Sequence, residues 1–244
     1  MVAFSDYLFK GAGLVKVVLP KKMVGITGVG VFNDCVSLKE IVFNDVITSL
    51  GYDTFVNCTA LENVDIPNTV VQMPGCFKNT GIKNITLPAG LNEWSSAFID
   101  CKNLESVTVT KGLVAISDNA FKNCTSLKTV TLADSVEKIG YEAFGGCSAL
   151  TNLILPDSVK YINSLAFNGC TSIKSIVVPA GVAIELFAFR GWTKDQTINF
   201  KSTAREATCW AYRMDFDGAK TWATDCNAKI VYSYVENQDS GNER

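Results

Sequence analysis

The stretch AFKNCTSLKTVTLADSVEKI, residues 120–139, decides the fold because its apolar pattern returns twice in the residues that follow. The pattern recurs in AFGGCSALTNLILPDSVKYI, residues 143–162, and begins a third time at residue 166. Working outward in both directions, the same phenylalanine recurs at steps of 21 to 23 residues: Phe9, Phe32, Phe55, Phe77, Phe98, Phe121, Phe144, Phe167 and Phe189. A period of this length is typical of solenoids, in which each repeat forms one coil and stacks on the next.

The residue types within one period predict the path of one coil. The segment Val130–Leu132 alternates between apolar and polar residues as a strand does. Its equivalents recur at 17–19, 41–43, 64–66, 85–87, 107–109, 153–155, 176–178 and 198–200. A second, short extended piece is expected at Val136–Ile139. The residue two after each recurring phenylalanine is Gly, Asn or Asp, which tolerate a left-handed backbone and so predict the end of a short helical turn.

Together these pieces predict a right-handed coil, because crossovers between parallel strands of one sheet are almost always right-handed. About six inward apolar side chains per coil contribute roughly 1.5–3 kcal/mol each when they are buried. A single coil would not offset the entropy lost on ordering its own chain. Stability is therefore expected to come from the contacts between neighbouring coils.

The repeat from Ala120 to Ile139 closely resembles the BspA-like class of leucine-rich repeats, and the resemblance runs from about residue 9 to residue 200. The resemblance implies an α/β-type solenoid, a curved coil of about nine repeats. It places a parallel β-sheet on the concave face and short helical or 3-10 turns elsewhere. It also implies a protein that binds rather than catalyses, often an adhesin at the surface of a bacterium or protist or secreted from it. The family has no shared catalytic residues to carry over.

Composition excludes several classes of function. The 244 residues contain no His, which removes Ser-His-Asp and Cys-His catalytic groups and any His-containing metal site. A net charge of −2 gives no electrostatic reason to expect nucleic acid or an anionic membrane as a partner. No window reaches the roughly 18 apolar residues of a membrane span, so we expect no membrane insertion. Residues 1–15 lack a signal-peptide core, so a cytoplasmic location stays open beside the surface or secreted location that the resemblance implies.

Six of the nine cysteines lie three residues after the recurring phenylalanine and are expected to form an inward column: Cys35, Cys58, Cys101, Cys124, Cys147 and Cys170. They have three interpretations: a disulfide ladder, a soft-metal stripe, or small hydrophobes that fill a fixed gap. We favour packing, because Ala12 and Thr80 stand in the same column and would interrupt a ladder. No C-x-x-C motif supports zinc, so neither a metal site nor a cofactor is expected. A bond between Cys209 and Cys226, outside the column, stays open.

The period stops after Phe200, and three parts are expected: a solenoid over residues 1–200, a capping unit over 201–235 and a disordered tail over 236–244. Residues 203–213 have a helix-forming composition, and residues 230, 232 and 234 alternate as in a final strand. Aromatic residues are frequent here, so a platform for sugar rings formed by Trp192, Trp210 and Trp222 is an alternative to a plain cap. We favour the cap, because a terminal unit must cover an open apolar end.

The outward side chains of the predicted strands form a face of small, β-branched and amide residues with little charge. The candidate binding residues on it are Glu40, Asn63, Asp65, Asn84, Thr86, Ser106, Thr108, Thr129, Thr131, Asn152 and Ser175. The face lacks the aromatic and Arg anchors of protein hot spots, so a partner is expected to make many weak polar contacts. The alternative is that these residues are simply good exposed strand formers.

The sequence therefore predicts a non-enzymatic binding or adhesion module whose partner is a protein or a glycan. Two alternatives stay open. One is an intracellular or phage-associated structural scaffold, and the other is a glycan-binding module built on the C-terminal aromatic residues.

Overall fold

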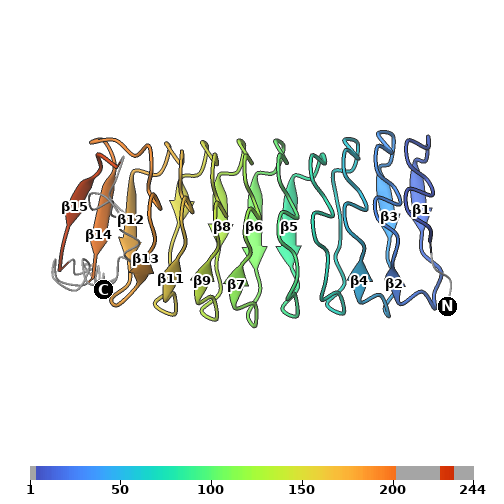
Figure 1. Cartoon of the computed structure of the whole chain (residues 1–244), viewed down its shortest axis with the longest axis horizontal. Helices are drawn as coiled ribbons and strands as arrows, with labels where there is room; N and C mark the ends of the chain where they lie inside the picture. Colours follow the sequence, from blue (N-terminus) through green and yellow to red (C-terminus); the bar gives the residue numbers. More distant parts are fainter. Residues whose placement is uncertain (1–3, 202–225, 234–244) are drawn as a thin grey trace, which may run out of the picture.

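The computed structural model of the chain describes residues 4–201 and 226–233. In this part the coils follow one another in one extended row, from β1 (Lys16–Val18) near one end to β15 (Lys229–Val231) at the other, with little bending along its length (Figure 1). The recurring phenylalanine rings stack from coil to coil, from Phe9 to Phe189, with centroids 5.4–5.7 Å apart. Side chains that recur once per period therefore lie on their counterparts, and the predicted solenoid is confirmed.

Most coils contribute one strand of two to four residues to the first set of parallel strands, whose outward surface we call the long-strand face. These strands are β1 (Lys16–Val18), β3 (Glu40–Val42), β5 (Asn84–Leu87), β6 (Ser106–Val109), β8 (Thr129–Thr131), β10 (Asn152–Leu153), β12 (Ser175–Val178), β14 (Thr197–Phe200) and β15 (Lys229–Val231). Equivalent residues pair in register, so that Asn84 faces Ser106, Ser106 faces Thr129 and Thr129 faces Asn152. The strand expected near residues 230–234 is present as β15 and pairs with β14.

This sheet is interrupted at two places. Residues 64–66, where a strand was expected, form no strand and pair with neither β3 nor β5. A second break separates β10 from β12. The first break falls where the phenylalanine steps shorten to 22 and 21 residues, from Phe55 to Phe77 and from Phe77 to Phe98.

A second set of short parallel strands lies on another side of each coil. It comprises β2 (Gly25–Ile26), β4 (Ser49–Leu50), β7 (Ala115–Ile116), β9 (Lys138–Ile139), β11 (Tyr161–Ile162) and β13 (Ala183–Ile184). The strands β2–β4 and β7–β9–β11–β13 pair in parallel, and isolated bridges from Ser49 to Gln72 and from Gln72 to Glu93 extend the pairing beyond β4 as far as Glu93. The second extended piece predicted around residues 136–139 is confirmed. Both strand sets bury alternate side chains in one continuous core.

The described part of the chain contains no helix, so the predicted helical turn around each phenylalanine and the α/β description are not confirmed. The nine residues two after the phenylalanine do have positive φ, as the Gly, Asn and Asp pattern predicted. The residues two before it have positive φ as well: Tyr7, Gly30, Asp53, Gly75, Ser96, Asn119, Glu142, Leu165 and Phe187. Two left-handed residues in one short turn interrupt the run of right-handed dihedral angles that a helix requires.

Candidate functional site

The long-strand face carries the predicted binding residues as an ordered array. Nine of the eleven are exposed, whereas Ser106 and Thr129 are half-buried. Register places Thr86, Thr108 and Thr131 in one column, and Asn84, Ser106, Thr129 and Asn152 in the next. Glu40, Asn63, Asp65 and Ser175 lie on the flanking coils of the same face. Whether these residues bind a partner stays a prediction.

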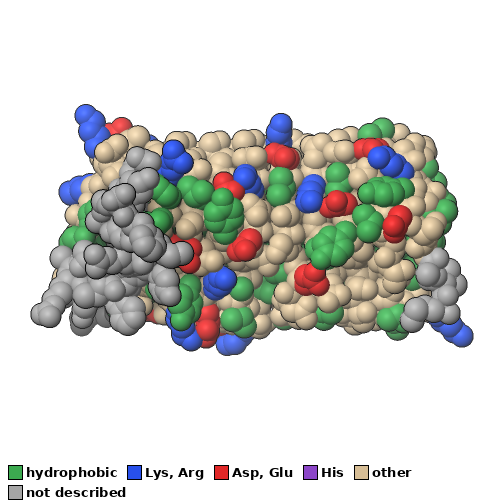
Figure 2. Space-filling view, viewed as in Figure 1, with side chains coloured by type: hydrophobic (Ala, Val, Ile, Leu, Met, Phe, Trp, Pro, Cys, Tyr) green, Lys and Arg blue, Asp and Glu red, His purple; other side chains and the backbone are tan. Residues whose placement is uncertain are grey.

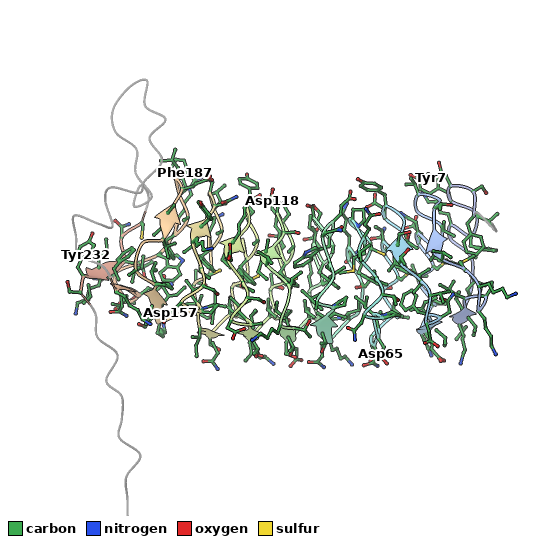
Figure 3. All side chains as sticks on the ribbon, turned by 90° about the horizontal axis from the view of Figure 1, so that it is seen from below. Tyr7, Asp65, Asp118, Asp157, Phe187 and Tyr232 are labelled. Atoms are coloured by element: carbon green, nitrogen blue, oxygen red, sulfur yellow. The ribbon has the colours of Figure 1, made fainter. Side chains whose placement is uncertain are left out.

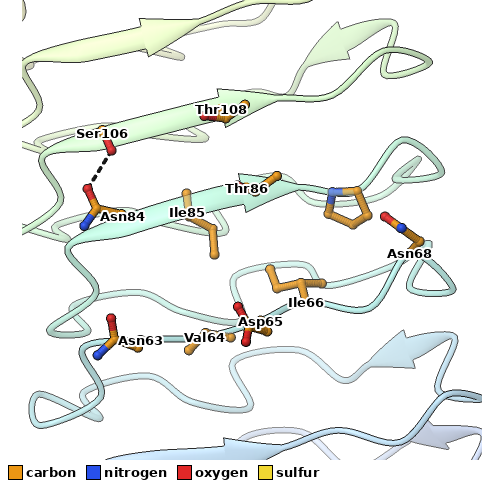
Figure 4. A pocket seen from close by; sticks show the side chains of 11 residues that line it. Asn63, Val64, Asp65, Ile66, Asn68, Asn84, Ile85, Thr86, Ser106 and Thr108 are labelled. Carbon is orange, nitrogen blue, oxygen red and sulfur yellow. Dashed lines mark hydrogen bonds between the residues drawn. The ribbon is translucent and has the colours of Figure 1, made fainter.

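The array is not flat, because hollows lie between the coils. The hollow that we call the central hollow has a volume of about 340 Å³ and lies between residues 63–68 and strands β5 and β6 (Figure 4). A second hollow of about 510 Å³ lies on the other side of residues 63–67, against β3, and includes Glu40 and Asp45. A third of about 360 Å³ lies against β8 and β10. The unpaired segment 63–66 thus forms a ridge with a hollow on each side.

Polar side chains on this face bond to each other across coils. Ser106 Oγ donates a hydrogen bond of 2.6 Å to Asn84 Oδ1, as Figure 4 shows, and Asn199 Nδ2 donates one of 2.7 Å to Ser175 Oγ. Asn199, the middle residue of the strand segment 198–200, is buried at 6 % exposure and makes this bond. Cross-coil bonds of this kind hold the array in fixed geometry.

Lysine and glutamate alternate along the start of the strands and pair from coil to coil. The pairs are Lys16–Glu40 at 2.7 Å, Lys83–Glu62 at 2.7 Å and Lys128–Glu105 at 2.9 Å. The Lys128 ammonium lowers the pKa of Glu105 through a hydrogen bond and its charge. Exposed pairs contribute little stability. The opposite charges of each pair cancel, so this edge of the long-strand face carries little net charge.

The opposite side of the row is different in character. Figure 3 places Asp65 and Asp157 on one side of the row and Tyr7, Asp118 and Phe187 on the other. In the view of Figure 2, basic and acidic side chains are intermixed, with exposed hydrophobic side chains between them. Exposed tyrosines include Tyr52, whose hydroxyl donates a hydrogen bond of 2.8 Å to Glu93. This arrangement concentrates neither sign of charge on that side.

The cysteine column is a packing element. All six side chains are buried and carry free thiols, so the disulfide ladder is wrong. Each thiol donates a hydrogen bond to a phenylalanine carbonyl of the preceding coil, such as Cys124 Sγ to Phe98 O at 3.1 Å. Burial raises the pKa of Cys58 and Cys147 to about 12 and of Cys101 to about 11. A protonated, enclosed thiol is a poor nucleophile and a poor metal ligand.

Three cysteines lie outside the column. Cys76 lies outside the column, immediately before Phe77, and is buried as a free thiol. The sequence pattern did not single it out. Cys226 is a half-buried free thiol, and Cys209 lies outside the described residues.

Trp192 does not form part of an exposed aromatic platform. It is 1 % exposed, packs edge-on against Phe189 with centroids 5.0 Å apart, and its indole N–H donates to Phe167 O at 2.9 Å. It thus takes the position and the hydrogen bond that cysteine has in the preceding coils. The alternative in which Trp192 stacks on a sugar ring is therefore wrong. Trp210 and Trp222 lie outside the described residues.

Gln196 closes the same end of the core. Its side-chain nitrogen donates to the carbonyls of Cys170 and Ile173 at 3.0 and 2.9 Å, and its oxygen accepts from Thr193 N at 3.1 Å. The side chain is 2 % exposed and satisfied at both ends. The boundary at residue 200 and the capping unit stay predictions, because residues 202–225 lie outside the described part. The tail expected at 236–244 also lies outside it.

A coil of one strand, a short second strand and a buried phenylalanine turn, repeated along one row, defines a solenoid of the leucine-rich repeat class. The model of the BspA type leucine rich repeat region, with six copies, matches residues 2–97 and 94–214. The chain therefore belongs to the BspA-type leucine-rich repeat family.

Solved structures agree with this assignment. A leucine-rich repeat protein of Bacteroides ovatus ATCC 8483 is 25 % identical with a TM-score of 0.60, covering 94 % of this chain and 69 % of its own. The leucine rich repeat protein of T. pallidum is 26 % identical with a TM-score of 0.54, covering 62 % of this chain and 72 % of its own. The comparison with curated proteins finds no match. In the described residues no helix has the length and apolar character needed to cross a bilayer.

Proposed function

We propose that the chain is a non-enzymatic binding module that holds a protein or glycan partner on its long-strand face, at a bacterial cell surface. The observation that carries the proposal is the ordered array of amide and hydroxyl side chains on paired strands, interrupted by shallow hollows. A rigid array with many exposed donors and acceptors suits recognition over a broad area. Surface location is supported by the family, whose members include surface adhesins.

Binding rather than catalysis is supported by the chemistry of the face. The described titratable groups on it are exposed carboxylates and lysines, several of them in ion pairs. A catalytic acid–base pair needs convergent groups in environments that separate their pKa values. The central and third hollows are lined mainly by amides, hydroxyls and apolar side chains, and the carboxylates of the second hollow, Glu40, Asp45 and Asp65, are all exposed.

The test is an array of immobilised glycans and extracellular-matrix proteins, probed with the full chain and two double variants. The first variant, Thr108→Arg with Thr131→Arg, places two long cations on the long-strand face. The matched control, Val114→Arg with Tyr141→Arg, alters two side chains that are 52 % and 40 % exposed and lie outside that face. We expect the first variant to lose binding and the control to keep it. Loss in the control alone, or no binding of the unmodified chain to any glycan or protein, contradicts the proposal.

A further inference from the structure

The central hollow lies at the first break in the sheet, where the regular repeat fails. The segment Asn63–Ile66 pairs with neither neighbouring strand, and the two coils that follow Phe55 are shortened. In a solenoid, an irregular coil is where the surface departs from a flat ladder. The central hollow beside it has a volume of about 340 Å³, within the usual range of ligand sites of about 300–1,000 Å³.

Polar side chains enter the central hollow from three coils. Figure 4 shows Asn63 and Asn84 at one end and Asn68 at the other, with the side chain of Asp65, which lies on the segment 63–66, between the two ends. The hydroxyl side chains that line the hollow are Thr86, Ser106 and Thr108. Because Ser106 donates to the Asn84 oxygen, the amide is oriented with its oxygen toward β6, which leaves its nitrogen as a donor for a ligand.

The lining selects among ligand chemistries. It contains three amides and three hydroxyls, each of them able to donate and accept, and one carboxylate that accepts. No lysine or arginine lines it, and Asp65 has no ion pair in the described part of the chain. An anionic ligand would meet Asp65 without a compensating cation. A sugar carries hydrogen-bond donors and acceptors on neighbouring hydroxyls, which match the amides, the hydroxyls and the Asp65 carboxylate of the lining.

We propose that the central hollow is a subsite for one residue of a neutral glycan, whose adjacent hydroxyls bond to Asp65, Asn84 and the flanking amides and hydroxyls. The inference rests on the proposed function and names the ligand class at one place on the long-strand face. The columns through Ser106, Thr129 and Asn152 repeat similar polar groups about 4.8 Å apart, since that is the spacing of paired strands. The glycan chain therefore runs along the row, and affinity rises with its length.

The test uses the full chain on an array of immobilised neutral oligosaccharides of increasing length, with sialylated and sulfated glycans and matrix proteins beside them. Thr86→Arg fills the central hollow with a long side chain, and Asp65→Asn removes the carboxylate charge while keeping its shape. Val114→Arg is the matched control, because Val114 is 52 % exposed and lies outside both the hollow and the long-strand face. We expect Thr86→Arg to weaken binding to a neutral oligosaccharide by at least about tenfold, the equivalent of 1.4 kcal/mol, with Asp65→Asn also weaker and Val114→Arg unchanged.

The outcomes separate this inference from the proposed function. Neutral-glycan binding that survives Thr86→Arg, or binding confined to acidic glycans, overturns the subsite and leaves a binding face elsewhere on the row. Binding to a matrix protein alone, lost in the Thr108→Arg, Thr131→Arg variant, overturns the glycan subsite and supports the proposed function. No binding to any array member overturns both. Equal thermal unfolding of the variants and the unmodified chain shows that the losses do not come from misfolding.

Discussion

The stacked phenylalanine rings are expected to contribute a measurable part of the free energy of unfolding. Phe121 is fully buried, stacks on Phe98 and Phe144 at 5.6 Å each and packs edge-on against Trp94 at 5.9 Å. Replacing it with leucine keeps most of the apolar volume and removes three aromatic pairs. At about 0.5–1.5 kcal/mol per pair, the loss is about 2–4 kcal/mol of unfolding free energy. Phe121→Ala, which also leaves a cavity, is expected to cost about 3–5 kcal/mol.

The assay is urea-induced unfolding followed by far-UV circular dichroism, with the midpoint and slope determined for each variant. Phe43→Leu is the matched control, because Phe43 is half-buried and makes one edge-on contact, to Phe55 at 6.3 Å. It is expected to cost about 1 kcal/mol. If Phe121→Leu costs no more than Phe43→Leu, the stacked rings do not contribute as argued.

Three further predictions concern the thiols, the turn and the sheet break. The pKa of Cys58 and Cys147 is raised to about 12 by burial, so above about pH 9 the unfolded chain ionises while the folded chain does not. The free energy of unfolding is therefore highest below about pH 9 and falls by about 1.4 kcal/mol per pH unit per thiol toward pH 12. Urea unfolding at pH 8, 9 and 10 measures this slope, and the double variant Cys58→Ala, Cys147→Ala must reduce it. Gly169→Ala, at φ 73°, is expected to cost about 1–2 kcal/mol, and Gly169→Asn less, because asparagine holds that position in three other coils; equal costs in the same assay would refute this. The amides of Val64–Ile66, which lack strand pairing, should exchange hydrogen faster than those of Val107–Val109, and equal protection by NMR would contradict the sheet break.

The sequence was most informative where one chemical requirement recurs in every coil. The inward phenylalanine and the left-handed residue two positions after it can be recognised because few residue types meet either requirement. The second left-handed position escapes the pattern, because residues as different as Tyr7, Ser96 and Leu165 occupy it. At this position the backbone hydrogen bonds to the neighbouring turns impose the left-handed conformation, at a cost in strain. The residue type at this position therefore does not reveal the conformation.

The sequence predicted which residues lie on the long-strand face, but it did not predict the hollows in that face. Alternation in the strands placed Thr86, Thr108 and Thr131 outward, and the register confirms that they align. The central hollow depends on how two shortened coils pack, which the 22- and 21-residue steps indicate without specifying. Trp192 lies three residues after Phe189 and so holds the cysteine position of its coil, which the sequence analysis did not recognise when it kept the aromatic platform as an alternative to the cap.

Hydrogen exchange measured by mass spectrometry would show whether a partner binds on the long-strand face. The full chain would be compared free and saturated with whichever glycan or protein the array identifies. We expect new protection in peptides that contain residues 63–68, 84–88 and 106–109. Protection confined to peptides that contain β7, β9 and β11, with the long strands unchanged, would contradict it.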